Sequence, residues 1–532
     1  MDTAAPIDDL TAPATRPRRR ISPSPVLLDM LAVTIAGALF RLGSLLTFPF
    51  PLHDGGLFVV MIRDIRAAGM AIPATTTYNG GGIPFDYPPL ALWLAALVPA
   101  DPLTIVRFAG PLAAVLTVPM VYLLALELLP GRPYAYVSAL LYAVIPRGWD
   151  WLVAGGSLTR TPGFLLALVG IWMLLRLLRT GKARYVAGAA VSAGLTVLTH
   201  PEAALFLAMA FGLITVMRVR DRAALRSVIW VAAGGFLVTL PWLMLLASRG
   251  RLSDLAHAGS QGVDPSTTIA AIITLRLTDE IYFPAVFALG LVGALALGQR
   301  RSWLVVLWLV AEVMLATRGA ETYACIPLSL AASVGLYDGI GQGILRIPSP
   351  DVFRSNAVRA LLLVVLAWSA FNGIGLAVEE IPPFDSLSAG GVNSMAWLEA
   401  NTPSDARFAV VSGQPWPRDV YGEWLPALTD RVSVATVQGR EWASRAAWDQ
   451  ALVTYDDLQQ CVHYDAACLV SWMRAHEGTG PNYVYVVDAH GANDTHDAND
   501  THPLVLDVLA SPDFQVVHKG DDGVVARLIA AP

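Results

Sequence analysis

Asp54 is the residue of this chain whose type and position best suit chemistry. It lies in the polar stretch 51–56, just after the first apolar run that is long enough to cross a membrane. A carboxylate at the membrane surface can act as a general base and remove the proton of a substrate hydroxyl. Asp is also an N-cap for the helix predicted over 55–68, and both roles are compatible because a helix N-terminus favours an anion. We therefore predict that Asp54 is a catalytic base.

Further polar residues gather near two tryptophans. Arg147, Asp150 and Arg160 surround Trp149 and Trp151. This pattern is typical of an interfacial aromatic belt in which arginines extend toward water. It also suits a sugar phosphate, because aromatic rings stack on sugars and Arg forms paired hydrogen bonds to phosphate. Asp150 and Arg160 are therefore candidate substrate-binding residues.

Two other pairs of titratable residues lie at predicted span ends. His200 and Glu202 flank Pro201 in a tight turn, which is either a simple polar turn or a site that binds a sugar hydroxyl and shares a proton. Arg318 and Glu321 are three residues apart, which favours a local ion pair. Alternatively, Arg318 neutralises a phosphate leaving group. All four are candidate substrate-binding residues.

The segment that contains Asp54 is one long polar connection, residues 49–87. Its part 55–68 predicts a short amphipathic helix, which is too charged to cross a membrane and is expected to lie in the interface plane. His53, Arg63 and Tyr87 in this connection are further candidate substrate-binding residues.

The composition indicates which elements position these residues. The chain is 55% hydrophobic and 15% charged, with a mean hydropathy of +0.54, which excludes an ordinary soluble domain. Apolar runs of roughly twenty residues recur, and each is a candidate membrane span. The net charge is -6 and no strongly basic face is present in the sequence, so a nucleic-acid partner is not expected.

The distribution of arginines predicts the topology. The first span covers 26–48, and the arginines before it place the N-terminus in the cytoplasm. The apolar segment 88–98 is short, and counting it as a crossing would put the basic loops between 176 and 359 outside. We therefore expect eleven spans, within a range of 11–13, in the plasma (inner) membrane, with Asp54 and the C-terminal part outside. The later spans are expected at 105–128, 134–145, 162–178, 185–198, 203–217, 228–246, 281–297, 303–316, 323–345 and 358–376.

Three regions follow from this topology. Residues 1–25 predict a disordered cytoplasmic tail, and 26–380 a transmembrane domain. Residues 385–532 predict an extracytoplasmic α/β domain, because strand-like runs at 408–411 and 483–487 alternate with helix-like stretches. The expected fold class is a mainly α, polytopic transmembrane bundle with a C-terminal α/β domain.

The C-terminal region carries two cysteines and a polar loop. Outside the cytoplasm, Cys461 and Cys468 can form a disulfide, and the alternative is two free thiols. The loop contains sequons at Asn493 and Asn499 together with several histidines. A metal site is compatible with it, but no ligand spacing supports one, so a solvated loop is expected.

The order of these features resembles the GT-C glycosyltransferases, which are integral-membrane enzymes that use polyprenyl-phosphate sugars. The resemblance covers about 26–376 and rests on an acidic residue at the start of the first outer loop, a Tyr87-Pro88-Pro89-Leu90 stretch at its end, many spans and an outer C-terminal domain. The chain is similar to protein O-mannosyltransferases and lipid A aminoarabinose transferases, and more distantly to the oligosaccharyltransferase catalytic subunit.

The resemblance assigns roles to particular residues. Asp54 matches the catalytic acidic residue of the first outer loop, although Gly55 stands where a second carboxylate often follows. The second outer loop lacks the Asp-x-Asp metal motif of the oligosaccharyltransferase, so the resemblance favours the metal-independent branch without a cofactor over an enzyme with a divalent metal. Arg318 with Tyr323 is similar to the start of a late span in the O-mannosyltransferase-like enzymes.

The implied reaction is transfer of a sugar from a polyprenyl-phosphate donor to a glycan, lipid or protein acceptor of the cell envelope. Asp54 would deprotonate the acceptor hydroxyl, and Arg160 and Arg318 would stabilise the departing lipid phosphate, with inversion of the anomeric centre. Two other classes remain open. One is a transporter or flippase, although no inverted repeat is evident. The other is a non-catalytic scaffold or carbohydrate-binding protein.

Overall fold

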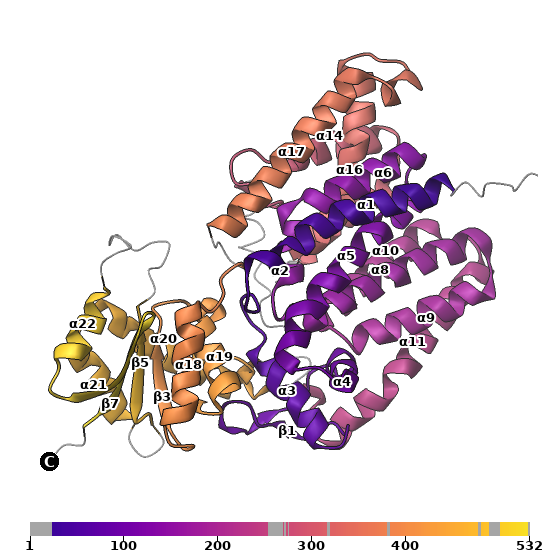
Figure 1. Cartoon of the computed structure of the whole chain (residues 1–532). Coiled ribbons are helices and arrows are strands. Elements are labelled where there is room, and N and C mark those ends of the chain that lie inside the picture. The colour runs from indigo at the N-terminus through magenta and orange to yellow at the C-terminus, as the bar shows by residue number, and fades with distance from the viewer. Residues whose placement is uncertain are drawn as a thin grey trace, which may run out of the picture.

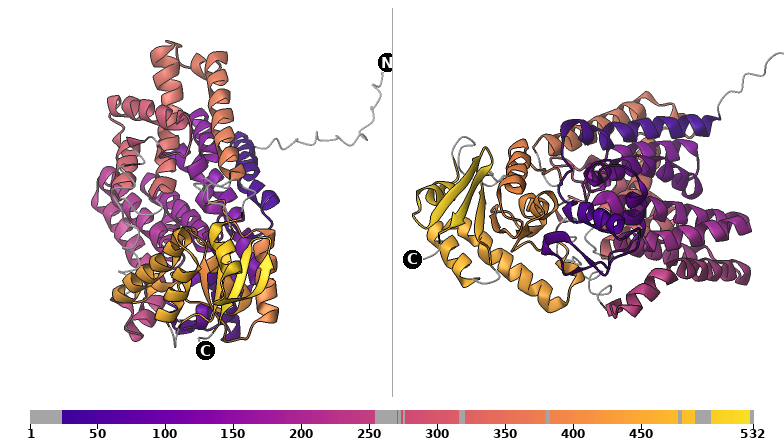
Figure 2. Two further views of the ribbon diagram at one scale, coloured as in Figure 1. Left: turned by 90° about the vertical axis from the view of Figure 1, so that its left-hand side faces the viewer. Right: turned by 60° about the horizontal axis from the view of Figure 1, so that its bottom comes forward.

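The structure is a computed structural model that describes residues 24–253, 270, 273–274, 276–315, 320–379, 383–476, 480–488 and 501–529. Almost all of the predicted N-terminal tail lies outside these residues, as do Arg318 and both sequons. The predicted fold class is confirmed, because a large helical bundle is joined to a smaller α/β unit at one end (Figure 1; Figure 2).

Each of the eleven predicted spans coincides with a helix of the described residues. Seven of these helices are long and apolar enough to cross a membrane. They are α1–α2 (Pro25–Arg41 and Gly43–Thr47), α5 (Pro102–Leu128), α8 (Ser157–Thr180), α10 (Pro201–Arg218), α11 (Arg222–Ser248), α16 (Ala320–Val334) continued by η3 (Gly335–Ile344), and α17 (Asn356–Val378). The other four are shorter: α6 (Arg132–Val144), α9 (Ala183–Val197), α14 (Ala285–Gln299) and α15 (Trp303–Leu315).

Local sequence signals set the ends of these helices. The side chains of Ser24, Asp101 and Asp221 accept backbone N–H groups at the starts of α1, α5 and α11. Pro201 begins α10, where its fixed φ suits the first helical position. Gly181 ends α8 in the left-handed conformation that glycine adopts without strain.

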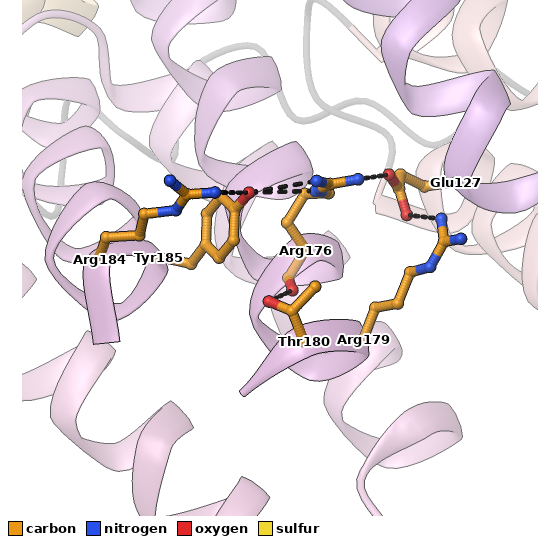
Figure 3. Close-up of polar contacts among 6 residues, drawn as sticks. All are labelled: Glu127, Arg176, Arg179, Thr180, Arg184 and Tyr185. Atoms are coloured by element: carbon orange, nitrogen blue, oxygen red, sulfur yellow. Dashed lines mark hydrogen bonds and ion pairs between the residues drawn. The ribbon is translucent and has the colours of Figure 1, made fainter. Parts of the chain in front are cut away.

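A charged network joins three helices at one end of the bundle (Figure 3). Glu127 of α5 accepts hydrogen bonds from Arg176 and Arg179 of α8, at 2.9 and 3.0 Å. The hydroxyl of Tyr185 in α9 accepts from Arg176 and Arg184, at 3.3 and 3.1 Å. Three arginines and one carboxylate meet in this network, so this end of the bundle carries a net positive charge.

The polar connection 49–87 forms α3 (Gly56–Ala67), β1 (Thr75–Thr76) and β2 (Ile83–Pro84), and is followed by α4 (Leu90–Leu97). The eight residues of α4 are too few to cross a membrane, in agreement with the prediction for 88–98. The predicted apolar stripe of α3 is buried, and so is Asp64, which accepts hydrogen bonds from Thr76 and Thr77 at 2.6 Å.

The C-terminal part contains a five-stranded sheet in the order β4-β3-β5-β7-β6. Strand β3 (Arg407–Val411) pairs in parallel with β4 (Val432–Ser433) and β5 (Tyr483–Val487), while β7 (Gly523–Leu528) runs antiparallel to β5 and β6 (Phe514–Gly520). The helices are α18 (Ala389–Asn401), α19 (Val420–Thr429), α20 (Arg445–Gln459), α21 (Ala466–Ala475) and α22 (Pro503–Ala510). Cys461 and Cys468 form a disulfide.

The two faces of this sheet belong to different hydrophobic cores, because side chains alternate along a strand. Ala409 and Val411 of β3 pack with residues of α20, α21 and α22. Phe408 and Val410 pack in one cluster with Trp424 of α19 and with residues of α3. The polar connection 49–87 and the C-terminal part therefore share a core, and the C-terminal part lies at the end of the bundle where Asp54 is found.

Candidate active site

Asp54 lies in the turn between α2 and α3 and faces the N-terminus of α8. The backbone N–H of Gly156, the N-cap residue of α8, donates to Asp54 Oδ1 at 2.6 Å. The N-cap residue of α3 is Gly55, at φ 131°, and no side chain caps that position. The capping role predicted for Asp54 in its own helix is therefore wrong, because the carboxylate is turned toward α8.

The close approach of these two segments requires glycine. A Cβ atom added to Gly155 would lie 1.6 Å from the carbonyl oxygen of Asp54. A Cβ atom added to Gly156 would lie 2.2 Å from Asp54 Oδ2. Both distances are far below van der Waals contact, so the loop before α8 can hold Asp54 only because it carries no side chain there.

The close packing of Gly156 against Asp54 predicts that an added methyl group at position 156 lowers the stability of the protein. Gly156→Ala is expected to lower the free energy of unfolding by about 1–3 kcal/mol, because the carboxylate or the loop must move. Gly212→Ala in α10 is the matched control, since an added Cβ there meets nothing within 4 Å and alanine favours a helix. Denaturation of both variants in the same detergent measures the difference. Equal stability of the two variants would contradict the packing.

Arg160 lies in the first turn of α8, four residues after Gly156, which donates to Asp54. Its Nη1 donates to the carbonyl of Trp151 at 3.1 Å, and its guanidinium lies over the Trp151 ring at 5.5 Å. The guanidinium interacts electrostatically with Asp54 and Glu202. This cation and the Asp54 carboxylate therefore lie near the same end of α8.

The predicted pair at the start of α10 joins the same site. The hydroxyl of Tyr87 lies 3.2 Å from His200 Nδ1 and 2.9 Å from Thr159 Oγ1, and Glu202 Oε2 lies 3.5 Å from His200 Nε2. Burial lowers the pKa of His200, although Glu202 opposes this, so the imidazole is neutral near pH 7. Tyr87 and His200 thus form a neutral, hydrogen-bonded pair next to the charged side chains of Glu202 and Arg160.

Tyr323 of α16 reaches the same region. Its ring stacks on Phe206 with 4.9 Å between centroids, and it interacts electrostatically with Arg160 and Glu202. The hydroxyl is buried and has no hydrogen-bond partner within the described part of the chain. A buried donor of this kind is suited to a substrate oxygen.

Other predicted residues lie apart from this group. Asp150 and Glu321 interact with Arg147, which forms an ion pair with Asp279 at 3.0 Å. Burial raises the pKa of Asp150 well above its ordinary value. Arg63 donates to the carbonyl oxygen of Ala427 at 2.9 Å, so its guanidinium contacts α19. Arg318 lies outside the described residues.

Glu423 of α19 was not among the residues predicted from the sequence. Its Oε1 accepts from the N–H groups of Gly55 and Gly56 at 2.8 and 3.1 Å. Burial and the neighbouring charge of Asp54 raise the pKa of Glu423 well above its ordinary value. No motif marks this residue, although it precedes the conspicuous Trp424-Leu425-Pro426 run.

Among the described residues, no group of three or more His, Cys, Asp and Glu side chains is arranged to hold a metal ion. The acidic residues near Asp54 instead contact backbone N–H groups, His200 or Arg160. The donor set of this site therefore suits sugar hydroxyls and a phosphate.

His53 connects the turn to the start of the C-terminal part. Its Nδ1 lies 2.7 Å from Asp385 Oδ1, and its ring meets Trp151 edge-on at 5.2 Å. Burial lowers the pKa of His53, but the hydrogen bond and charge of Asp385 outweigh it, so the pKa lies above the ordinary value. The strength of the ion pair between His53 and Asp385 therefore depends on pH, and this pair joins the helical bundle to the C-terminal part.

The sign of this shift predicts how stability varies with pH. A raised pKa contributes stability that is fully present below the unfolded value of about 6.5 and is lost as the pH rises through the folded pKa. We expect Asp385→Asn to cost about 1.5–3 kcal/mol in acidic buffer and progressively less in alkaline buffer. Melting temperatures of both proteins across this range measure the loss. A cost that does not change with pH would refute the ion pair.

Residues 86–245 match the model of the dolichyl-phosphate-mannose-protein mannosyltransferase family. No curated protein sequence matches the chain. The matched segment contains Tyr87, Arg160, His200 and Glu202, so the family likeness covers most of the residues that converge near Asp54.

Solved membrane glycosyltransferases have similar structures. The oligosaccharyltransferase AglB from Archaeoglobus fulgidus, in complex with an inhibitory peptide and a dolichol-phosphate, is 14% identical with a TM-score of 0.57, over 87% of this chain and 69% of that one. ArnT from Cupriavidus metallidurans, bound to undecaprenyl phosphate, is 14% identical with a TM-score of 0.55, over 95% and 98%. The arabinofuranosyltransferase AftD from Mycobacteria is 18% identical with a TM-score of 0.58, over 94% of this chain and 40% of that one. The chain is thus an integral membrane protein with the fold of the GT-C glycosyltransferases.

Proposed function

We propose that the protein transfers a sugar from a polyprenyl-phosphate donor to a hydroxyl group of a glycan, lipid or protein acceptor. The observation that carries this proposal concerns the N-terminal end of α8. Asp54 accepts a hydrogen bond from the N-cap residue there, and Arg160 belongs to the first turn of the same helix. A base and a phosphate-binding cation are the two groups that such a displacement needs. The undecaprenyl phosphate and dolichol-phosphate in the similar structures support a lipid-linked donor.

The proposed reaction is a single displacement. Asp54 accepts the proton of the acceptor hydroxyl, and the hydroxyl oxygen forms a bond to the anomeric carbon. The bond between that carbon and the phosphate oxygen breaks, and both of its electrons leave with the lipid phosphate. Arg160 stabilises this anion, with Arg318 as the second proposed cation. Attack opposite the leaving group inverts the anomeric centre, and no step needs a metal ion.

The orientation in the membrane is part of the proposal. Arg176 and Arg179 lie in the last turns of α8, whereas Asp54 contacts its N-terminal end, so the two groups lie at opposite ends of the bundle. Glu423 of the C-terminal part contacts Gly55, so this part lies at the same end as Asp54. The positive-inside rule then places the N-terminus in the cytoplasm and the active site outside, in the plasma (inner) membrane.

A direct assay tests this function. The purified protein is incubated with radiolabelled polyprenyl-phosphate sugars and with extracted envelope glycans, lipids and proteins. We expect transfer of label that continues in the presence of EDTA, with a product anomer opposite to that of the donor. Sugar binding without transfer would instead indicate a carbohydrate-binding scaffold. Movement of labelled lipid across a vesicle without a new bond would indicate a transporter.

A further inference from the structure

The turn that carries Asp54 is held by a helix that belongs to the C-terminal part. Trp424 Nε1 donates to the carbonyl oxygen of His53 at 3.0 Å. The adjacent Glu423 accepts from the N–H groups of Gly55 and Gly56 through a single oxygen. Two consecutive residues of α19 thus fix the backbone on both sides of Asp54.

Glu423 supplies the hydrogen-bond acceptor for two backbone N–H groups of the turn, which has no such acceptor of its own. Gly55 and Gly56 begin α3, and no side chain from within α3 or before it caps these N–H groups. The approach of α19 is close, because a Cβ atom added to Gly56 would lie 2.9 Å from the Glu423 carbonyl oxygen. Glu423 is 8% exposed, so water does not easily replace its carboxyl group.

We propose that Glu423 is a positioning residue: by binding Gly55 and Gly56 it sets the direction of the Asp54 carboxylate, so that the C-terminal domain completes the active site. This inference rests on the proposed function. Glu423 contacts the turn and not the cation Arg160, so its removal should affect the chemical step and leave donor binding nearly unchanged.

Three substitutions separate positioning from simple attachment of the C-terminal domain. Glu423→Ala removes the acceptor, and we expect kcat to fall by about 10–100-fold with KM for the donor within about 3-fold, because small displacements of a reacting group cost this much. Glu423→Gln keeps an oxygen acceptor and should restore kcat to near the original value. Tyr78→Phe is the matched control, since it removes only the bond from the Tyr78 hydroxyl to the Glu423 carbonyl oxygen at the same interface.

The measurements are steady-state kinetics and melting temperature for each variant. If Glu423→Ala does not fold, Glu423→Asp serves instead, because the shorter side chain withdraws the carboxyl group and should also lower kcat. Unchanged kcat in these variants, or an equal loss in Tyr78→Phe, would overturn the positioning role. Asp54→Asn in the same assay keeps the two hypotheses apart: an active Asp54→Asn protein refutes the proposed function, whereas an inactive one beside a normal Glu423→Ala refutes only this inference.

Discussion

Asp54→Asn is expected to lower kcat by about a thousandfold while leaving the fold intact. The amide oxygen of asparagine can still accept the hydrogen bond from Gly156, so the turn keeps its geometry. The side chain, however, can no longer take up the proton of the acceptor, and loss of a general base costs about 10²–10⁴ in rate. The measurement is single-turnover transfer of labelled sugar at saturating donor.

The matched control is Asp101→Asn. Asp101 caps α5 by accepting from the N–H of Thr104, and asparagine is an equally good N-cap. We expect this variant to retain normal transfer. Full turnover by a well-folded Asp54→Asn protein would show that this carboxylate is not the base.

Arg160→Ala is expected to lower kcat by about 10²–10³-fold, because a cation aimed at the leaving phosphate acts mainly in the transition state. Arg160→Lys should recover part of this loss, since lysine keeps the charge but not the two-pronged geometry. The loss of kcat in Arg160→Ala should also depend on the leaving group. We expect a smaller loss with a donor whose phosphate is a better leaving group.

Arg66→Ala is a control for the removal of an arginine, here one within the polar connection 49–87. The Arg66 guanidinium donates to the carbonyl oxygens of Ala96, Val98 and Ala100, so its loss should affect stability more than transfer. If Arg66→Ala and Arg160→Ala reduce transfer equally at matched stability, Arg160 has no special role in the reaction.

The helical bundle was predictable because its signal is local. Long apolar runs and the arginines in the loops between them lie within or beside the segments that they define. The strands at 407–411 and 483–487 were similarly visible as β-branched and aromatic runs. The short α4 was also recognised, because its length alone prevents a crossing.

The site was only partly predictable, because its contacts join segments that are distant in the sequence. Gly156 meets Asp54 across 102 residues, and Glu423 meets Gly55 across 368. A capping role within α3 was a reasonable expectation from spacing alone, but Gly55 is the N-cap residue and the Asp54 carboxylate accepts from Gly156 instead. Nothing in the local pattern around Glu423 indicates that its carboxyl group is buried against another segment.

The core shared by α3 and the sheet has a consequence for synthesis of the protein. Gly56 precedes Glu423 by 367 residues, so at roughly 5–20 residues per second the ribosome needs on the order of 20–70 s to supply the partner of α3. During this interval Phe58, Met61 and Ile65 have no cover from α19. A nascent chain stalled before α19 would therefore expose an apolar helix to chaperones and proteases, because the core around α3 closes only after α19 has been synthesised.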